Sequence, residues 1–269
     1  MVVGESSGDI LGADLIKALR KHYPNAHFEG VGGPLMQALG FQSHFEMERL
    51  SVMGFVEPLK RLPELLSMRR ALIRRYRETP PAAFIGIDSP DFNLQIELSL
   101  RQSGIKTIHY VSPSVWAWRQ GRIKKIVRCV DLMLTLLPFE SDFYRQHQVP
   151  VRFVGHPLAD QYPLQPDTIG ARRALGLQMD TPTLTLMPGS RGSEVDMMAP
   201  LFMQVVARVR EDVPNLQVLV PAANAARYRQ LTALLGSFNL AEVRLLEQQS
   251  KLAMEASDVV LLTSGTTAL

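Results

Sequence analysis

The chain has 269 residues, more than one typical domain needs and enough for two, and 46% of them are hydrophobic. Because only 20% of the residues are charged, the composition excludes a largely disordered chain. The formal net charge of +3 suits anionic partners such as phosphates or lipid head groups, without choosing among them.

Cysteine usage and apolar runs indicate the compartment. The single cysteine, Cys129, excludes an internal disulfide and suits a reducing environment. No apolar run approaches the roughly 18 residues that span a bilayer, and the first residues lack the basic leader and apolar stretch of a signal peptide. We therefore expect a cytoplasmic protein that can still touch a membrane surface.

Short apolar runs alternate with segments of helical period along the chain, for example helical stretches at 10–21, 201–211 and 251–256. This alternation predicts an α/β protein with parallel sheets wound on both faces. The expected strands are residues 1–4, 27–31, 83–87, 107–111, 132–136 and 152–154, followed by 183–187, 216–220, 243–246 and 259–262.

A proline-containing segment without apolar period, residues 155–167, is expected to link two doubly wound, Rossmann-like domains. The expected domains are residues 1–157 and residues 168–269. The second domain has only four expected strands, and Leu269 falls in the first turn of a new helix. We therefore expect this domain to be truncated at its C-terminus.

In open α/β sheets ligands bind beyond the carboxyl ends of the strands, so residues just after a strand are the main site candidates. Residues 4–9 (Gly-Glu-Ser-Ser-Gly-Asp) lie between the first strand and a helix. Small residues there let backbone N–H groups approach an anion at the positive end of the helix. The alternative is a turn in which Ser6 or Ser7 caps the helix, and the sequence leaves both open.

Residues 86–93 (Gly-Ile-Asp-Ser-Pro-Asp-Phe-Asn) contain two carboxylates with different expected roles. Asp88 falls at the end of an apolar strand, where a carboxylate has no structural purpose, so it is the better candidate for a general base. Asp91 follows Pro90 in the expected first turn of a helix, where a carboxylate interacts favourably with the helix dipole.

Both tryptophans of the chain, Trp116 and Trp118, lie in a proline-containing loop after the strand at 107–111. Two tryptophans on one loop suit a wall for a sugar or an acyl chain, or else a plug over the sheet. His109, inside the strand, is expected to pack in the core.

Two later loops between a strand and a helix suit an anion. Residues 188–194 (Pro-Gly-Ser-Arg-Gly-Ser-Glu) place Arg191 at the start of a helix. There its guanidinium and the backbone N–H groups could together bind a diphosphate. Ser193 and Asp196 could instead form a capping box, and both interpretations can hold at once. Residues 263–267 (Thr-Ser-Gly-Thr-Thr) offer a second anion cradle, or ordinary caps.

The histidines and the cysteine show no metal-ligand spacing, and no Asp-x-Asp pair is present to carry a metal-bound diphosphate. We therefore expect no metal and no cofactor. The charge of a diphosphate would then be met by Arg191 and by helix ends.

Residues 49–77 are apolar and basic together. Such a segment is usually a solvated helix face, but the run Met53-Gly54-Phe55-Val56 adds weight to binding at a membrane surface. Its basic residues, opposed by Glu57 and Glu64 alone, are Arg49, Lys60, Arg61, Arg69, Arg70, Arg74, Arg75 and Arg77.

Taken together, five segments in this order resemble the lipid-A-disaccharide synthase family: residues 4–9, 52–54, 86–93, 109–118 and 188–191. The resemblance covers essentially the whole chain. That family is similar to other GT-B glycosyltransferases, which implies two Rossmann-like domains with a cleft between them. The family continues past Leu269, so we expect this chain by itself to be inactive.

The resemblance implies an inverting glycosyltransferase of lipid A (lipopolysaccharide) biosynthesis. It implies transfer of 2,3-diacylglucosamine from UDP-2,3-diacylglucosamine to the 6-hydroxyl of 2,3-diacylglucosamine 1-phosphate, with release of UDP. It also implies a peripheral protein on the cytoplasmic face of the inner membrane, with no nucleic acid partner, and leaves oligomer formation open.

The same resemblance implies roles for individual residues. Asp88 matches the base on the acceptor side, and Arg191, Ser264 and Thr266 match the diphosphate side. Glu5 matches a polar site residue whose role stays open. Another strand-end residue, Asn224, is expected to line the nucleotide cleft, and Trp116 and Trp118 to lie on the acceptor side.

Two other functions are compatible with the same motifs. One is another UDP-sugar enzyme of the GT-B class, such as an epimerase or a peptidoglycan glycosyltransferase. The other is a non-catalytic nucleotide-binding module at the membrane. Asp88 argues against the module, because binding alone does not require a carboxylate at a strand end.

Overall fold

The computed structural model describes residues 1–50, 56–236, 238 and 243–264, with the backbone alone at 56–60. The chain divides into two compact units, Met1–Tyr162 and Pro163–Leu269. This division falls inside the segment 155–167. Within that segment Pro157–Asp160 forms a short 3-10 helix, η3, and Gln161 donates a hydrogen bond to Asp14 of the first unit (3.2 Å).

The first unit contains a five-stranded parallel sheet in the order β1-β4-β5-β6-β7. The strands are β1 (Val2–Val3), β4 (Phe84–Ile87), β5 (Thr107–Tyr110), β6 (Leu132–Thr135) and β7 (Val151–Phe153). Beside β1 lies a small parallel pair, β2 (Glu29–Gly30) and β3 (Gln42–Ser43), where Val31 bridges to Val2.

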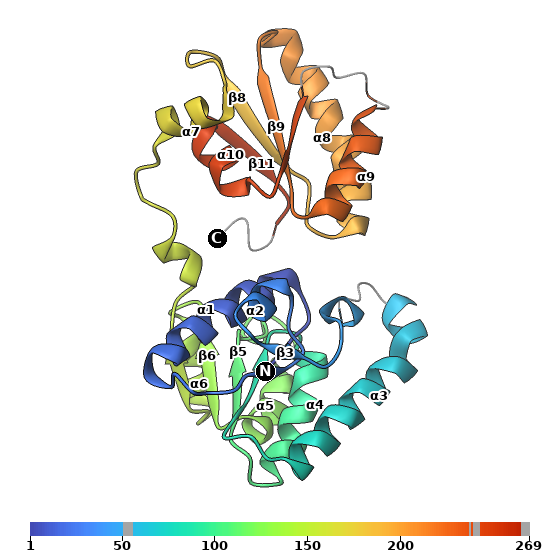
Figure 1. Ribbon diagram of the computed structural model, residues 1–269, viewed down its shortest axis with the longest axis vertical. Helices are drawn as coiled ribbons and strands as arrows, with labels where there is room; N and C mark the ends of the chain where they lie inside the picture. Colours follow the sequence, from blue (N-terminus) through green and yellow to red (C-terminus); the bar gives the residue numbers. More distant parts are fainter. Residues whose placement is uncertain (51–55, 237, 239–242, 265–269) are drawn as a thin grey trace. The chain divides into compact units, whose positions relative to one another are not determined.

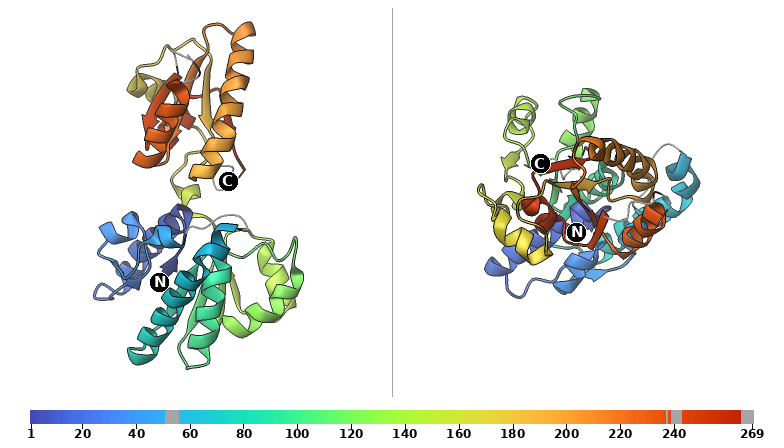
Figure 2. Two further views of the ribbon diagram at one scale, coloured as in Figure 1. Left: turned by 90° about the vertical axis from the view of Figure 1, so that its right-hand side faces the viewer. Right: turned by 90° about the horizontal axis from the view of Figure 1, so that it is seen from above.

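Helices cover both faces of this sheet (Figure 1). α4 packs against β4 and β5, with α3 and α5 beside it, and Figure 2 shows α3 and α4 side by side. α1 lies on the other face, since a Cβ on its Gly8 would touch the Val3 and Ile87 side chains. The helices are α1 (Ser6–His22), α2 (Pro34–Ala38), η1 (Met47–Arg49), α3 (Val56–Glu78), α4 (Pro90–Arg101), η2 (Gln120–Arg122), α5 (Ile123–Cys129) and α6 (Glu140–Gln146).

The second unit contains a four-stranded parallel sheet in the order β10-β9-β8-β11. Helices α8 and α9 contact each other on one face, and α7 and α10 contact each other on the other face (Figures 1 and 2). The strands are β8 (Thr183–Met187), β9 (Gln217–Ala222), β10 (Val243–Glu247) and β11 (Val259–Leu262), and the helices are α7 (Thr168–Leu175), α8 (Gly192–Asp212), α9 (Ala225–Gly236) and α10 (Ser250–Ala256).

Every strand expected from the sequence is present, and no boundary differs by more than two residues. The short strand β3 was not expected. The helix predicted at 201–211 begins at Gly192 and carries Pro200 inside it. Pro200 interrupts the apolar period, and this interruption hid the first part of the helix.

Candidate functional site

One group of candidate residues lies at the carboxyl edge of the first sheet. Because β1 and β4 are parallel neighbours with Val3 opposite Ile87, their strand ends place Gly4 and Asp88 side by side. A Cβ on Gly4 would lie 2.2 Å from Oγ of Ser89, so any other residue at this position would force the Ser89 hydroxyl to move where the two loops meet. The sheet thus brings the loops of Glu5 and Asp88 together, as expected for residues that serve one site.

Asp88 occupies an unusual backbone conformation. Its φ is 54°, and that of Ser89 is 45°, so two successive non-glycine residues are left-handed. Such residues cost on the order of 1 kcal/mol each and concentrate at functional sites. The side chain of Asp88 is half-buried and forms no hydrogen bond or ion pair with any residue that the structure describes.

Asp91 differs from Asp88 in every respect that matters for catalysis. It lies in the first turn of α4, as predicted. Its side chain is 80% exposed and forms an ion pair with Arg122. Asp91 is therefore a surface carboxylate at a helix start, and Asp88 remains the candidate base.

The start of the first helix decides against one of the two interpretations of residues 4–9. α1 starts at Ser6 with Glu5 as the N-cap residue, so neither Ser6 nor Ser7 caps it, and the alternative of a serine cap is wrong. Asp9, which the sequence left without a role, is buried and caps α2 instead. Its carboxylate accepts hydrogen bonds from the N–H groups of Gly33, Leu35 and Met36, at 3.1, 2.9 and 3.1 Å.

The loop after β5 exposes both tryptophans. Trp116 is 37% exposed and Trp118 is 60% exposed, whereas Val115 between Ser114 and Trp116 is buried. The plug over the sheet is therefore Val115 and not a tryptophan. Trp116 packs edge-to-face on Phe139, with ring centroids 4.9 Å apart, and the Arg119 guanidinium lies over Trp118. The exposed rings form an aromatic surface suited to an apolar or sugar ligand.

His109 packs in the core, as predicted, but it has a charged partner. Its Nδ1 lies 2.7 Å from Oε1 of Glu97 on α4, and both side chains are fully buried. Burial raises the pKa of Glu97 above its usual range, and His109 opposes this shift. A Cβ on Gly86 would lie 2.2 Å from Oε1 of Glu97, so only glycine at this position admits the carboxylate.

A second group of candidate residues lies at the carboxyl edge of the second sheet. Arg191 follows the central strand β8, Asn224 follows β9 on one side, and Ser264 follows β11 on the other. The N–H of Thr263 donates to the carbonyl of Met187 (3.1 Å), which holds the end of β11 beside the start of the Arg191 loop. Thr266 and residues 52–54 lie outside the described residues.

Arg191 is the N-cap residue of α8 and is tied to Glu194. Its guanidinium donates to Oε1 of Glu194 (2.9 Å), and the backbone N–H groups of Ser190 and Arg191 donate to Oε2 (3.2 Å each). The predicted Ser193–Asp196 capping box is wrong, because the residue that reaches back over the helix start is Glu194. An anion bound here would compete with the Glu194 carboxylate for the same donors.

Asn224 caps α9, since its Oδ1 accepts from the N–H of Arg227 (2.9 Å). The sequence did not single out Arg227, whose guanidinium lies over the first turn of α8: a Cβ on Gly192 would be 2.8 Å from its Nη1. Its Nε is buried without a hydrogen-bond partner among the described residues. Only the fold reveals this second cation near Arg191, because Arg227 belongs to another helix.

Within the described ranges, no group of three or more His, Cys, Asp or Glu residues is placed to hold a metal ion. In the same part of the chain, no helix is both long and apolar enough to cross a membrane.

Comparisons of the sequence with known proteins all match the chain to the same protein family. The family model of lipid-A-disaccharide synthetase matches residues 1–269. Curated relatives named lipid-A-disaccharide synthase include those of Saccharophagus degradans (54% identical over 271 residues) and Cellvibrio japonicus (55% over 269). Each match covers all of this chain and 70% of the relative.

Solved structures of the same fold are more distant in sequence. The UDP-GlcNAc 2-epimerase of Neisseria meningitidis bound to UDP-GlcNAc has a TM-score of 0.62 at 13% identity, over 96% of this chain and 75% of that one. The calicheamicin glycosyltransferase CalG4 has a TM-score of 0.50 at 16% identity, over 94% and 74% of the two chains. These likenesses show the GT-B type of fold, with two Rossmann-like α/β domains.

Proposed function

The chain belongs to the lipid-A-disaccharide synthetase family, and we propose that it supplies the base and the diphosphate-binding loops of an inverting glycosyltransferase. The observation that carries this proposal is the family match over all 269 residues. The reaction class is glycosyl transfer in lipid A biosynthesis. The solved UDP-GlcNAc 2-epimerases share the fold at only 11–13% sequence identity, which does not favour epimerase activity here.

The proposed donor is UDP-2,3-diacylglucosamine and the proposed acceptor is 2,3-diacylglucosamine 1-phosphate. The 6-oxygen of the acceptor attacks the anomeric carbon of the donor as the bond from that carbon to the diphosphate breaks. The electron pair leaves with UDP, and the hydroxyl proton passes to the carboxylate of Asp88. Attack opposite the leaving group inverts the anomeric centre and gives lipid A disaccharide 1-phosphate.

Asp88 is suited to this role because its carboxylate forms no hydrogen bond or ion pair with any described residue. The other carboxylate of the motif, Asp91, is exposed and forms an ion pair with Arg122. Glu5 lies in the adjoining loop and is proposed as a polar group of the same site, with no assigned step. The left-handed backbone of Asp88 and Ser89 fixes the direction in which the Asp88 side chain points at the end of β4.

Charge on the departing diphosphate is proposed to be met by Arg191, by Ser264 and Thr266, and by the N–H groups at the start of α8. Asn224 is proposed to line the nucleotide site from the end of β9. Arg227 adds a second positive charge against Gly192, where the anion would approach the helix. This scheme assigns no step to a metal ion.

Both proposed substrates carry acyl chains, and the exposed rings of Trp116, Trp118 and Phe139 offer an aromatic surface for one of them. Such substrates also place the enzyme at a lipid surface. We therefore propose that the protein lies on the cytoplasmic face of the inner membrane as a peripheral protein, with α3 as its membrane contact.

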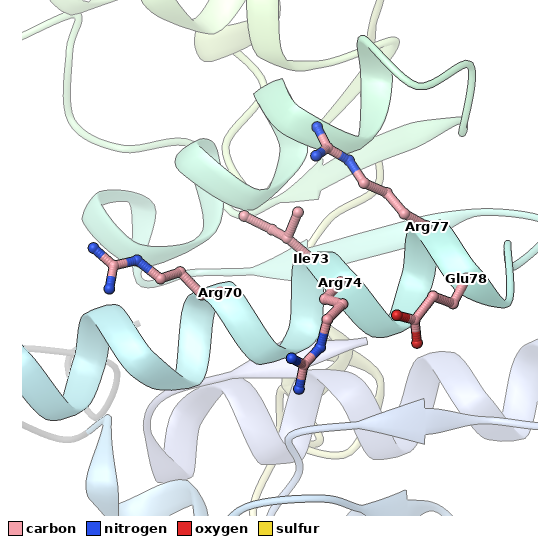
Figure 3. A pocket seen from close by; sticks show the side chains of 5 residues that line it. All are labelled: Arg70, Ile73, Arg74, Arg77 and Glu78. Atoms are coloured by element: carbon pink, nitrogen blue, oxygen red, sulfur yellow. The ribbon is translucent and has the colours of Figure 1, made fainter.

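Among the basic residues of the segment 49–77, the structure distinguishes those with a bonded partner from exposed ones without an ion pair among the described residues. Arg75 is bound to Glu29 through two hydrogen bonds of 2.8 Å, Arg49 and Arg61 to Glu64, and Arg77 to Ser99 and Ser103. Burial lowers the pKa of Arg69 from its usual value. Arg70 and Arg74 are exposed one turn apart and line a shallow pocket with Ile73, Arg77 and Glu78 (Figure 3).

The apolar residues of the same segment also differ in how far they are exposed to solvent. Leu65 packs against the core of the first unit, Leu66 is half-buried, and Leu62 is 46% exposed. Leu59 lies among the residues whose side chains are not described. The exposed Leu62 together with Arg70 and Arg74 is the described surface that we propose meets anionic lipid head groups.

The direct test is UDP release by the full-length protein supplied with both diacylated substrates. We expect release that requires both substrates and a disaccharide product with a β-linked new bond. UDP release from the donor alone, or 2-epimerisation of UDP-GlcNAc without transfer, would overturn the proposal.

A further inference from the structure

The turn that carries Asp88 is held by one buried side chain, Asn93. The carboxamide nitrogen of Asn93 lies 2.8 Å from the carbonyl oxygen of Asp88, 3.2 Å from that of Val2 and 3.5 Å from that of Ile87. Asn93 is fully buried at the second turn of α4. One amide group thus joins the ends of β1 and β4 to the left-handed turn.

This arrangement is needed because the turn opposes the backbone preference of its residues. Asp88 and Ser89 are both left-handed, and neither is glycine. Each costs on the order of 1 kcal/mol relative to ordinary backbone, so the turn persists only where its surroundings impose it. The backbone N–H of Asp88 is already used, since it donates to the carbonyl of Tyr110 (2.8 Å), and Asn93 fixes the carbonyl on the other side of the same residue.

The helix that presents Asn93 is itself anchored at the next turn. Glu97 lies four residues further along α4 and is paired with His109 of β5, both fully buried. A Cβ on Gly86 would lie 2.2 Å from Glu97 and 2.9 Å from Asn93, so the missing side chain of Gly86 lets α4 approach β4. Asn93 is therefore held at a fixed depth over the strand that ends in Asp88.

We propose that Asn93 is a positioning residue for the reaction: by clamping the Asp88–Ser89 turn it aims the Asp88 carboxylate at the acceptor hydroxyl. This inference rests on the proposed function, in which Asp88 is the base. Asn93 itself touches no substrate, so its removal should slow the chemical step without weakening substrate binding.

The experiment is a double-mutant cycle of Asn93→Ala and Asp88→Asn in the full-length protein, with kcat, the KM of both substrates and the melting temperature measured for each variant. Asn93→Ala is expected to lower kcat about tenfold or more, with both KM values within about twofold of wild type. In the Asp88→Asn background the same change should alter kcat less than about twofold, because it acts only through Asp88.

Two further variants separate positioning from loss of stability. Thr107→Val removes another buried hydrogen bond, from Thr107 Oγ1 to the carbonyl of Cys129 (2.8 Å), at the opposite end of the same sheet. It should lower the melting temperature and leave kcat unchanged. Asn93→Leu keeps much of the shape of the side chain but removes its N–H donors, and it serves if Asn93→Ala does not fold.

Three outcomes would overturn the inference. If Asn93→Ala and Asn93→Leu keep the wild-type kcat, the clamp does not aim the base. If the kcat losses from Asn93→Ala and Asp88→Asn multiply, Asn93 acts independently of Asp88. If Asp88→Asn alone is nearly as active as wild type, the proposed base is wrong and the positioning role fails with it.

Discussion

Nδ1 of His109 lies 2.7 Å from Oε1 of Glu97, and neither side chain is accessible to solvent. The other two polar atoms of this pair, Nε2 of His109 and Oε2 of Glu97, have no hydrogen-bond partner among the described residues. Burial makes the Glu97 carboxyl costly to ionise, so its protonation is coupled to folding.

The first prediction concerns the pH dependence of stability. Burial raises the pKa of Glu97. The folded state therefore binds the Glu97 proton more tightly than the unfolded state, and this contribution is complete below the unfolded pKa, about 4.3. The stabilising contribution of the Glu97 proton is lost as the pH rises through the pKa of Glu97 in the folded state. Glu97→Gln cannot titrate, so urea unfolding should show it gaining free energy of unfolding relative to wild type as pH rises above about 4.3.

A comparison with Glu97→Ala checks the cause. Gln keeps an acceptor for His109, whereas Ala leaves the imidazole unpaired, so Glu97→Ala should be less stable than Glu97→Gln by about 3 kcal/mol. A difference between Glu97→Gln and wild type that stays constant from pH 4 to 8 would show that Glu97 does not titrate with folding.

The second prediction concerns the base. In the full-length protein Asp88→Asn should lower kcat by about a hundredfold or more, because the hydroxyl proton then lacks an acceptor. Substrate affinities should change little, since the amide keeps the shape of the side chain. Asp91→Asn is the matched control: it changes the surface carboxylate of the same motif and should leave kcat near wild type. Near-normal turnover in Asp88→Asn would remove Asp88 from the mechanism.

The sequence predicted the strands well because each is a short apolar run bounded by turn residues, and the carboxyl-edge positions of Asp88, Arg191 and Asn224 follow from strand order. It could not predict Asn93 or Asp9 as internal braces. Asn93 bonds to Val2, 91 positions away, and Asp9 to residues 24–27 positions away. Such pairings depend on tertiary packing, so both residues looked like parts of a loop motif.

The capping box suggested for the start of α8 was wrong for a different reason. Ser193 and Asp196 have the spacing of a capping box, but the helix begins one residue before Ser193, which makes Glu194 the residue that reaches back. With Ser193 as the N-cap the helix would begin at Glu194, so a shift of two residues in the helix start reassigns the cap. The same shift determines that Arg191 is paired before any ligand binds.

The third prediction follows from that pairing. Arg191→Ala should weaken UDP binding about 10- to 100-fold, the effect of a lost charge-assisted hydrogen bond, and should slow transfer. Isothermal titration with UDP measures the first effect. Arg208→Ala, which removes an exposed arginine near the other end of α8, is the control and should bind UDP normally.

The same charge scheme predicts the response to chelation. Because arginines and helix N–H groups are proposed to meet the diphosphate charge, excess EDTA should leave the wild-type rate unchanged. Strong inhibition by EDTA that a divalent cation reverses would contradict the scheme, whatever the effect of Arg191→Ala.

The last prediction concerns the membrane and uses the division of the α3 arginines. Each basic residue near an anionic surface contributes about 1 kcal/mol, and the effect decays within a Debye length. Arg70, Arg74 and Arg75 are all exposed on α3, but only Arg75 forms an ion pair with a described residue, Glu29. Co-sedimentation with vesicles containing anionic phospholipid should therefore weaken strongly in Arg70→Glu/Arg74→Glu, and wild-type binding should fall as salt rises.

The matched control is Lys124→Glu/Arg128→Glu, which reverses two exposed charges with the same spacing on α5. Both double variants have the same net charge, so a general electrostatic effect would weaken them equally. If α3 is the contact, only the Arg70/Arg74 variant loses vesicle binding, and Leu62→Ser should weaken the binding that persists at high salt, because that part depends on apolar contact. Equal losses in the two double variants, or wild-type protein that never binds vesicles at low salt, would show that α3 is not the membrane contact.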